Sequence, residues 1–157
     1  MTETRTAEGG RRLTELVDGI RFAMLTTTDA AGDLPARPLT VQRVDDDGTV
    51  WFLVDAEAAW ITGPMTSVNV AFTDSDTWVS ATGTAQVVTD RAALEELGDP
   101  ESDAWLKEST TPAALKVSVG EADYWDAPNR AVQLLAAGKA LLTGSQPDIG
   151  DRGVVRP

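Results

Sequence analysis

The sequence predicts a mainly β protein, a small antiparallel barrel of about six strands with α-helical additions. The first observation is a series of three β-type segments, residues 22–28, 36–44 and 49–54, joined by short connections that contain Asp and Gly. Asp and Gly supply the backbone conformations that hairpin turns need, so these segments read as a three-stranded meander. The second observation is that strand patterns return after residue 65. The third is that the helical patterns around them are short.

A helix at residues 11–20 precedes the meander. Four apolar residues at helical spacing form one stripe along it: Leu13, Leu16, Val17 and Ile20. A stripe of this kind is typical of a helix that packs on a core. Gly9 and Gly10 leave the start of the helix undefined.

The middle strand of the meander, residues 36–44, contains Pro38. Proline cannot donate a hydrogen bond to a neighbouring strand, so this strand lies at an edge or leaves the pairing at Pro38. Either arrangement leaves Arg37 free to meet a ligand. Arg37 is therefore a candidate for binding an anion, with a solvated arginine on an edge strand as the alternative.

The third strand, residues 49–54, has no polar alternation after Thr49. Both of its faces should be covered, which suits a central barrel strand or a dimer contact. Residues 56–62 are expected to form one or two helical turns that end at Gly63 and Pro64.

Two later strands show alternating apolar residues, one at Val68, Val70 and Phe72 and one at Leu115, Val117 and Val119. The second of them leads through Gly120 into residues 122–126. A long strand at residues 77–88 lies between the two, and Gly83 in its middle predicts a bulge or a barrel corner.

A short helix is expected to begin at Asp90 and end at Gly98, with Leu94 and Leu97 facing inward. The segment that follows, residues 99–111, is irregular and polar, and Trp105 and Leu106 are expected to anchor it.

The C-terminal part of the chain combines one helix with a tail. Residues 129–142 have a helical pattern, and residues 144–157 form a polar tail without periodicity. No linker or repeat divides the sequence. We therefore expect a single domain over residues 1–157, with a core at about residues 12–142.

Composition excludes several classes of site. The 157 residues include neither histidine nor cysteine, which excludes disulfides, thiolate nucleophiles, His-based triads and the common zinc and haem sites. The sequence contains no recognisable metal site, and it identifies no catalytic residue. The formal net charge of −12 disfavours nucleic acid as a partner, because nucleic acid attracts clustered Lys and Arg.

The same composition predicts a cytoplasmic protein. No run of about 18 apolar residues occurs, so no membrane span is expected. The N-terminus lacks the basic and apolar regions of a signal peptide.

Five segments occur in the order and spacing of a known family: FAMLTTTDAAGDLPARPLT, VWFLVDAE, VNVAF, ATGTAQVVTDRAALEEL and DYWDAP. Over about residues 13–142 the chain resembles the general stress protein class of the pyridoxamine 5'-phosphate oxidase-like FMN-binding split barrels. The resemblance implies a homodimer of six-stranded split barrels with two FMN sites at the dimer interface. It also implies an FMN-dependent oxidoreductase, in which the cofactor carries the redox chemistry.

The resemblance implies that two strands hold the cofactor. In it, Arg37 faces the phosphate, its strand lies along the flavin, and the backbone of the following strand faces the isoalloxazine ring. Tryptophans elsewhere are candidates for an aromatic pocket at the interface, with a core or dimer role as the alternative. The candidate cofactor-binding residues are Arg37, Pro38, Leu39, Thr40, Trp51, Phe52, Leu53, Val54, Trp60, Trp78 and Trp125.

The chain departs from the family at one place. The family has a Ser-x-Lys after the third strand that completes the phosphate site, and its positions are Ala58 and Trp60 here. A hydroxyl donor and a cation are missing, and charge-assisted hydrogen bonds are worth about 1.5–3 kcal/mol each. The primary hypothesis is FMN in a weakened site. One alternative is a flavin-free relative that binds or transforms another small molecule in the same cleft. Another is a deazaflavin-type cofactor, which needs the same phosphate contacts.

Overall fold

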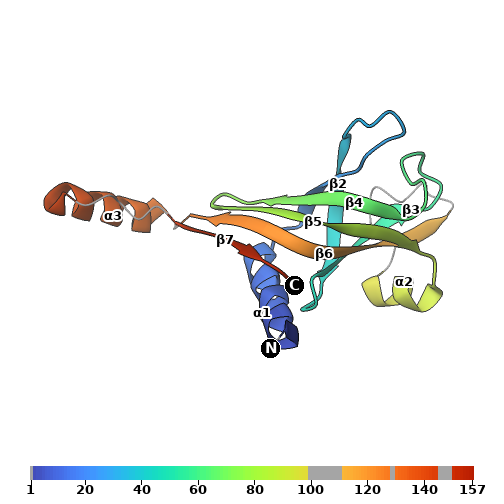
Figure 1. The fold of residues 1–157 in the computed structure, drawn as a ribbon, viewed down its shortest axis with the longest axis horizontal. Helices are drawn as coiled ribbons and strands as arrows, with labels where there is room; N and C mark the ends of the chain where they lie inside the picture. The colour runs from blue at the N-terminus through green and yellow to red at the C-terminus, as the bar shows by residue number, and fades with distance from the viewer. Residues whose placement is uncertain (1, 99–110, 128–129, 145–149) are drawn as a thin grey trace.

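The computed structural model describes residues 2–98, 111–127, 130–144 and 150–157, which form seven strands and three helices (Figure 1). In chain order these elements are α1 (Thr2–Val17), β1 (Phe22–Thr26), β2 (Ala36–Val44), β3 (Thr49–Asp55), β4 (Met65–Thr73), β5 (Thr77–Val88), α2 (Arg91–Leu97), β6 (Pro112–Asp126), α3 (Arg130–Thr143) and β7 (Asp151–Val155).

Six strands close into an antiparallel barrel. Their order is β3-β2-β1-β4-β5-β6, and pairing of β3 with β6 completes the ring. This confirms the six-stranded antiparallel barrel that the sequence predicts. β7 lies beside the ring, because it pairs with residues 122–126 of β6, whereas β3 pairs with residues 112–118 of the same strand.

The barrel interior is filled by inward-facing strand residues and by one face of α1. The largest fully buried side chains are Phe52, Phe72, Leu13, Leu25, Leu115, Val50, Val70 and Val117. Leu13, Leu16 and Val17 of α1 belong to this cluster, which confirms the predicted helical stripe. In Figure 1 α1 lies below the barrel, with the N-terminus directed away from it.

β3 is a central strand of the barrel. Val50, Phe52 and Val54 face the core, and Leu53 on the opposite face is only 5% exposed. α2 packs against β3 and β6. The apolar run at residues 49–54 is therefore covered on both sides within a single chain. Of the two expected arrangements, a central barrel strand or a dimer contact, the structure shows the central strand.

β2 is not an edge strand, which corrects half of the proline-based expectation. It pairs with β1 along residues 36–40, where Pro38 lies opposite Met24. It pairs with β3 only from Val41 onward, after the segment that contains Pro38. The missing N–H of Pro38 is tolerated because the strand has no ladder partner on its second side at that position.

Two glycine positions are explained by close backbone approaches. α1 runs through Gly9 and Gly10, although glycine weakens a helix by roughly 1 kcal/mol relative to alanine. A Cβ at Gly10 would collide with the carbonyl oxygen of Asp46, so only glycine lets α1 lie this close to the β2–β3 turn. At Gly83 the pairing of β5 with β6 shifts register, which confirms the predicted bulge.

Two predicted helical segments are less regular than expected. Residues 56–62 form successive turns rather than a helix. The amide of Ala58 donates a hydrogen bond to the carbonyl of Asp55, and the amide of Ile61 donates one to the carbonyl of Ala58. Gly63 and Pro64 follow too soon for a helix to propagate. α2 forms as predicted, and Leu94 and Leu97 are half-buried rather than core residues. Trp105 and Leu106 lie outside the described residues.

The C-terminal region contains more structure than expected. Its last residues form β7, where the sequence predicts a tail without secondary structure, because a strand of five residues with Gly153 inside it shows too little alternation to recognise. α3 forms as predicted and projects away from the barrel (Figure 1). In the part of the chain that the structure describes, no helix has the length and apolar character needed to cross a membrane.

Candidate functional site

The barrel opens between β2 and β3. The two strands pair from Val41 opposite Phe52 to Val44 opposite Val50. Beyond that point residues 36–40 of β2 pair only with β1, and residues 53–55 of β3 pair only with β6. These two segments, called the split here, diverge and turn one edge each toward the space between them. Backbone N–H and C=O groups without a ladder partner need another hydrogen-bond partner, which water or a bound ligand can supply.

Arg37 lies at the split and faces the barrel interior. It is opposite Leu25, a fully buried core residue, and directly opposed residues of an antiparallel pair share a face. Its Nη1 donates a hydrogen bond of 2.9 Å to the hydroxyl of Thr27, which is itself buried. Partial burial lowers the pKa of Arg37 from its ordinary value, which still leaves a full positive charge. The cation is thus fixed in position by the chain.

Trp60 covers one face of this cation. The Arg37 guanidinium carbon lies 4.3 Å from the centroid of the indole ring, within the range of a cation–π contact. Trp60 also packs against the barrel core. Within the described chain Arg37 uses two of its donors, on Thr27 and, at a long 3.5 Å, on the carbonyl of Pro35.

A pocket of about 370 Å³ lies beside Arg37, between the β1–β2 and β3–β4 connections. It is lined by Thr27, Thr28, Asp29, Ala30, Ala31, Pro35, Ala59, Trp60 and Thr62. Arg37 contacts three of these residues: Thr27, Pro35 and Trp60. The carboxylate of Asp29 accepts hydrogen bonds from the amides of Ala31 and Asp33, which fixes the β1–β2 loop as one wall.

The N–H groups of Arg37 are placed to bind one side of an anion such as a phosphate. Arg37 offers in-plane donors, and two of the residues that would strengthen such a site are absent. Ala58 has no hydroxyl and Trp60 no charge, so neither residue adds a donor or a cation to Arg37. The residues present therefore fit a phosphate bound by a single arginine, more weakly than by a complete set of donors.

β3 contributes to the split through its backbone. Phe52 and Val54 point into the core, and Leu53 is buried on the opposite face. The Trp51 indole N–H donates a 2.8 Å hydrogen bond to Asp45, and the ring lies near Arg43 and Lys116. None of these four side chains is directed to the split. A ligand there would meet the main chain of β3, as the resemblance implies.

Of the remaining predicted residues, all except Leu39 lie on the outer surface of the barrel. Leu39 faces inward like Arg37, because it is opposite the buried Ala23, whereas Pro38 and Thr40 face outward. The register places Thr40 opposite Phe22, and Trp78 between Thr73 and Trp125. Trp125 in turn lies opposite Arg152, whose guanidinium is 5.1 Å from the indole centroid.

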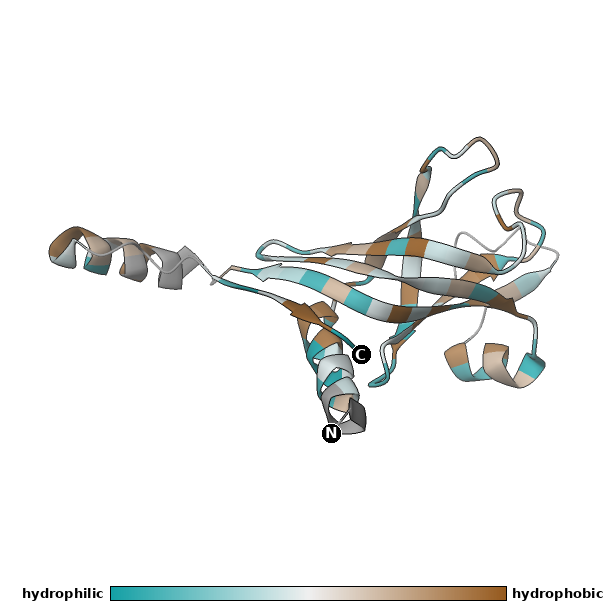
Figure 2. Ribbon diagram, in the orientation of Figure 1, coloured by the Kyte–Doolittle hydropathy of each residue, from teal (hydrophilic) through white to brown (hydrophobic). Residues whose placement is uncertain are grey.

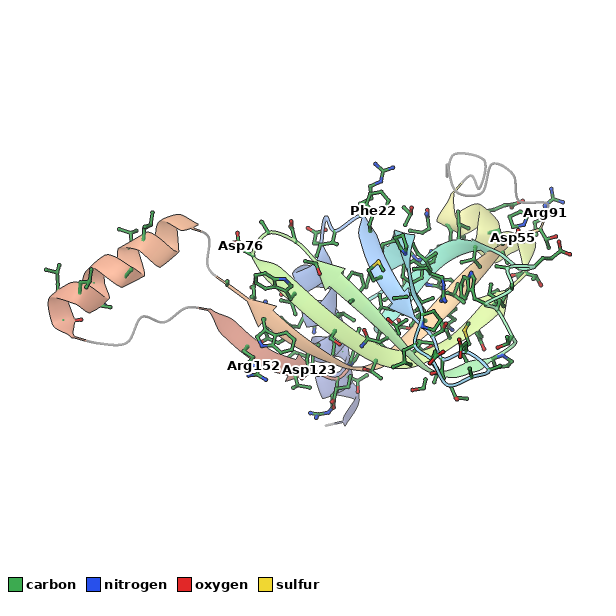
Figure 3. The ribbon with its side chains drawn as sticks, turned by 90° about the horizontal axis from the view of Figure 1, so that it is seen from above. Phe22, Asp55, Asp76, Arg91, Asp123 and Arg152 are labelled. Carbon is green, nitrogen blue, oxygen red and sulfur yellow. The ribbon has the colours of Figure 1, made fainter. Side chains whose placement is uncertain are left out.

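This surface carries an apolar patch, called the outer sheet face here, of five large side chains. Their exposed fractions are 51% for Phe22, 42% for Met24, 44% for Trp78, 40% for Trp125 and 45% for Val154. Figure 3 shows Phe22 and Arg152 on the barrel, with Arg152 near the end from which α3 projects. The structure thus brings Thr40, Trp78 and Trp125 to one face and separates them from Arg37 and Trp60.

Thr27 is the site residue that sequence reasoning missed. The threonines at positions 26–28 look like ordinary strand residues. The available signal is alternation: Ala23 and Leu25 face inward, so Thr27 continues that face and meets Arg37. Among the described residues no cluster of three or more His, Cys, Asp or Glu side chains is arranged to hold a metal ion.

Comparison with known proteins places this geometry in context. Residues 8–148 match the family model described as pyridoxamine 5'-phosphate oxidase like. A crystal structure of a candidate general stress protein 26 from Jannaschia sp. CCS1 is 24% identical, with 96% of this chain and 99% of that chain covered and a TM-score of 0.76. No curated protein sequence matches the chain.

A second similar structure is described as a general stress FMN/FAD-binding protein from Xanthomonas citri. It is 28% identical, with 77% of this chain and 90% of that chain covered and a TM-score of 0.60. The HupZ protein of Group A Streptococcus also matches, at 22% identity and a TM-score of 0.52, over 71% of this chain and 90% of its own. At that identity the likeness concerns the fold alone.

Proposed function

The chain belongs to the pyridoxamine 5'-phosphate oxidase-like family, and we propose from this premise that it binds FMN at the split and acts as an FMN-dependent oxidoreductase. We further propose that it works as a homodimer. The proposal rests on the position of Arg37. This residue lies on the inward face of β2 where β2 and β3 separate, beside the 370 Å³ pocket. The description of the Xanthomonas citri relative as FMN/FAD-binding supports the choice of ligand.

Each residue at the split has a role in this proposal. Arg37 binds the phosphate with its in-plane N–H groups, and Thr27 and Trp60 hold the guanidinium in place. The main chain of β3 at residues 53–55 offers donors and acceptors to the flavin ring. Bound FMN would supply the capacity to accept and return electrons. The protein orients the ring and limits the access of water, and no side chain is assigned as an acid or base.

A second candidate function is favoured by Trp60. Its ring covers one face of Arg37 and packs on the core, so it narrows the space for a phosphate with its full set of contacts. A planar ligand without phosphate could bind the same pocket by stacking and hydrogen bonding. The protein would then bind or transform a different small molecule at the split, without flavin.

The experiment compares FMN with riboflavin, which lacks the phosphate. Purified protein is titrated with each flavin while flavin fluorescence is followed, for the parent chain and for Arg37→Ala. We expect the parent to bind FMN more tightly than riboflavin by about tenfold or more, since one charge-assisted contact is worth about 1.5–3 kcal/mol. Arg37→Ala should abolish this preference and leave riboflavin binding almost unchanged.

Three outcomes separate the hypotheses. Equal affinity for the two flavins in the parent would show that Arg37 does not bind phosphate. Loss of FMN and riboflavin binding together in Arg37→Ala would indicate damage to the pocket, which a urea unfolding curve detects. A parent protein that binds neither flavin would contradict the FMN proposal and favour a ligand without phosphate.

A further inference from the structure

α3 is the one described helix that stands apart from the barrel. α1 and α2 pack against strands, whereas α3 makes no comparable contact with any other element that the structure describes. Figures 1 and 3 show it projecting beyond the end of the sheet in two perpendicular views. It is inserted between β6 and β7, which pair with each other, so both of its ends are connected to the sheet.

One face of α3 is strongly apolar. With about 100° between successive residues, five residues whose side chains the structure describes fall within an arc of roughly 120°. They are Leu134, Leu135, Gly138, Leu141 and Leu142, called the leucine face here. Figure 2 shows brown, hydrophobic segments on this projecting helix. An arc of this width is what a globular protein buries against its core.

The leucine face is uncovered within a single chain. Leu134 and Leu135 are each 74% exposed, Leu141 is 88% exposed and Leu142 is 89% exposed. A helix of 14 residues is also marginal in water without packing, because nucleation is costly. The helix and its leucines therefore require a covering surface that its own barrel does not provide.

We infer that the leucine face of α3 docks on the outer sheet face of a second copy of this chain, so that two copies exchange helices. The inference rests on the homodimer of the proposed function and adds the elements that form it. The outer sheet face is the other large apolar surface in the described part of the chain: with Leu34, it and the leucine face contain all of its exposed large hydrophobic residues.

The position of α3 favours a reciprocal arrangement. β6 ends at Asp126, directly after Trp125, and β7 begins at Asp151, directly before Arg152. The helix thus leaves the barrel beside the Trp78–Trp125 part of the outer sheet face. Around a two-fold axis near this point, each helix reaches the same surface of the other copy, as a closed symmetric dimer requires. A single exchange would then cover both apolar surfaces of both chains.

Charge also favours a copy of this chain as the partner. α3 contains Arg130 and Lys139 and no acidic residue. All 25 acidic residues of the chain lie outside it, together with 11 of the 13 basic residues. Opposite charge on two docking surfaces promotes association and disfavours a reversed pairing. On the outer sheet face, Asp123 between Ser80 and Val154 provides a negative group, and Arg152 beside Trp125 provides a positive one.

The first experiment weakens the leucine face and measures dimerisation. Leu135→Gln combined with Leu142→Gln keeps residues that favour a helix but removes apolar surface. Sedimentation equilibrium should show a dimer dissociation constant raised by about a hundredfold or more, because each copy buries both leucines. At protein concentrations below the dissociation constant of the variant, far-ultraviolet circular dichroism should show a loss of helix.

The matched control places the same residue outside the leucine face of α3. Ala137→Gln combined with Ala140→Gln lies outside the leucine face and should leave the dissociation constant and the helical signal unchanged. A leucine variant that dimerises as tightly as the parent, with full helical signal, would overturn the inference. FMN binding by the parent is measured independently, so this failure is distinct from failure of the proposed function.

The second experiment identifies the surface that receives the helix. The chain contains no cysteine, so single cysteines report contacts without background. Leu135→Cys and Ser80→Cys chains are mixed, exchanged and treated with a short bismaleimide. A covalent dimer of the two different variants is expected, and Glu57→Cys in place of Ser80→Cys should give none. Linkage within one chain of the Leu135→Cys, Ser80→Cys double variant, under dilution, would show that α3 folds back on its own barrel and would overturn the inference.

Discussion

At the scale of single residues, Arg37 is held on several sides by its own chain. The buried hydroxyl of Thr27 and the carbonyl of Pro35 accept hydrogen bonds from Arg37, and the indole ring of Trp60 makes a cation–π contact with it. These contacts hold the cation in place before any ligand arrives. Pre-organisation of this kind reduces the entropy lost on binding, which partly offsets the donors missing at positions 58 and 60.

The first prediction concerns those two positions. Ala58→Ser with Trp60→Lys would restore a hydroxyl donor and a cation, so FMN affinity should rise by roughly two orders of magnitude, at about 1.4 kcal/mol per tenfold. Flavin fluorescence titration measures the change. Ala59→Ser with Trp60→Lys serves as the control, because it places the hydroxyl one residue away. If the double change leaves FMN affinity where it was and the parent binds no flavin, the pocket is built for a different ligand.

The second prediction concerns Thr27. Thr27→Val preserves the shape of a buried side chain and removes the acceptor of the Arg37 hydrogen bond. The free energy of unfolding should fall by about 1 kcal/mol, because Arg37 is only partly buried and water can replace the bond. Urea denaturation measures it. Thr28→Val, at an exposed neighbour, should change stability by less than about 0.5 kcal/mol. An equal effect at both positions would mean that the hydrogen bond contributes nothing.

At the scale of elements, α1 shows a local preference overruled by packing. Its glycines weaken the helix, yet the β2–β3 turn and the C-terminal segment pass so close that a Cβ at Gly10 or Gly9 would collide with backbone oxygens of Asp46 or Arg156. The low helix propensity of the two glycines can be read from the sequence. The close backbone approach that requires glycine is visible only in the fold.

The third prediction follows from this contact. Gly10→Ala should destabilise the protein by about 1–3 kcal/mol, although alanine is the better helix former. Thermal unfolding followed by circular dichroism measures it. Ala7→Gly at an exposed position of the same helix is the reference, and should cost about 0.5–1 kcal/mol through propensity alone. A stabilised Gly10→Ala protein would show that α1 can move away from the turn.

The elements also show what a sequence can predict. The bounds of β2 and β5, residues 36–44 and 77–88, were predictable because strong alternation and turn residues define their ends. The bounds of α1 and the existence of β7 were not, because a close backbone approach and a five-residue pairing leave no periodic signal. For the site, the sequence identifies Arg37 and Trp60 as important. It does not reveal that they touch, since that depends on the turns at residues 55–61.

At the scale of the whole molecule, the large exposed hydrophobic side chains of the described chain, apart from Leu34, gather on two surfaces. The leucine face and the outer sheet face together hold nine large hydrophobic side chains between 40% and 89% exposed. Exposed apolar side chains that cluster in this way mark an interaction site. With a net charge of −12, copies of the chain repel one another at long range, so their association depends on the specific fit of these surfaces.

The fourth prediction is therefore the mass of the protein in solution. Light scattering at micromolar concentration should give twice the chain mass of 16.7 kDa. An interface of this type buries about 2,000 Å² or more, so the dimer should persist on dilution. Trp78→Glu on the outer sheet face should favour the monomer, and Asp76→Gln in the neighbouring turn should not. A parent protein with the mass of one chain would contradict both the homodimer and the helix exchange.

β6 has a further consequence through its place in the chain. It pairs with β3, β5 and β7, so the ring cannot close until its residues exist. During translation the free edge of β3, complete at Asp55, has no partner before Pro112 leaves the ribosome. At roughly 5–20 residues per second, that edge waits about 3–11 seconds, plus the time to clear the exit tunnel. The nascent chain therefore presents an apolar, open-edged sheet for seconds, a state in which a holding chaperone would improve the yield of folded protein.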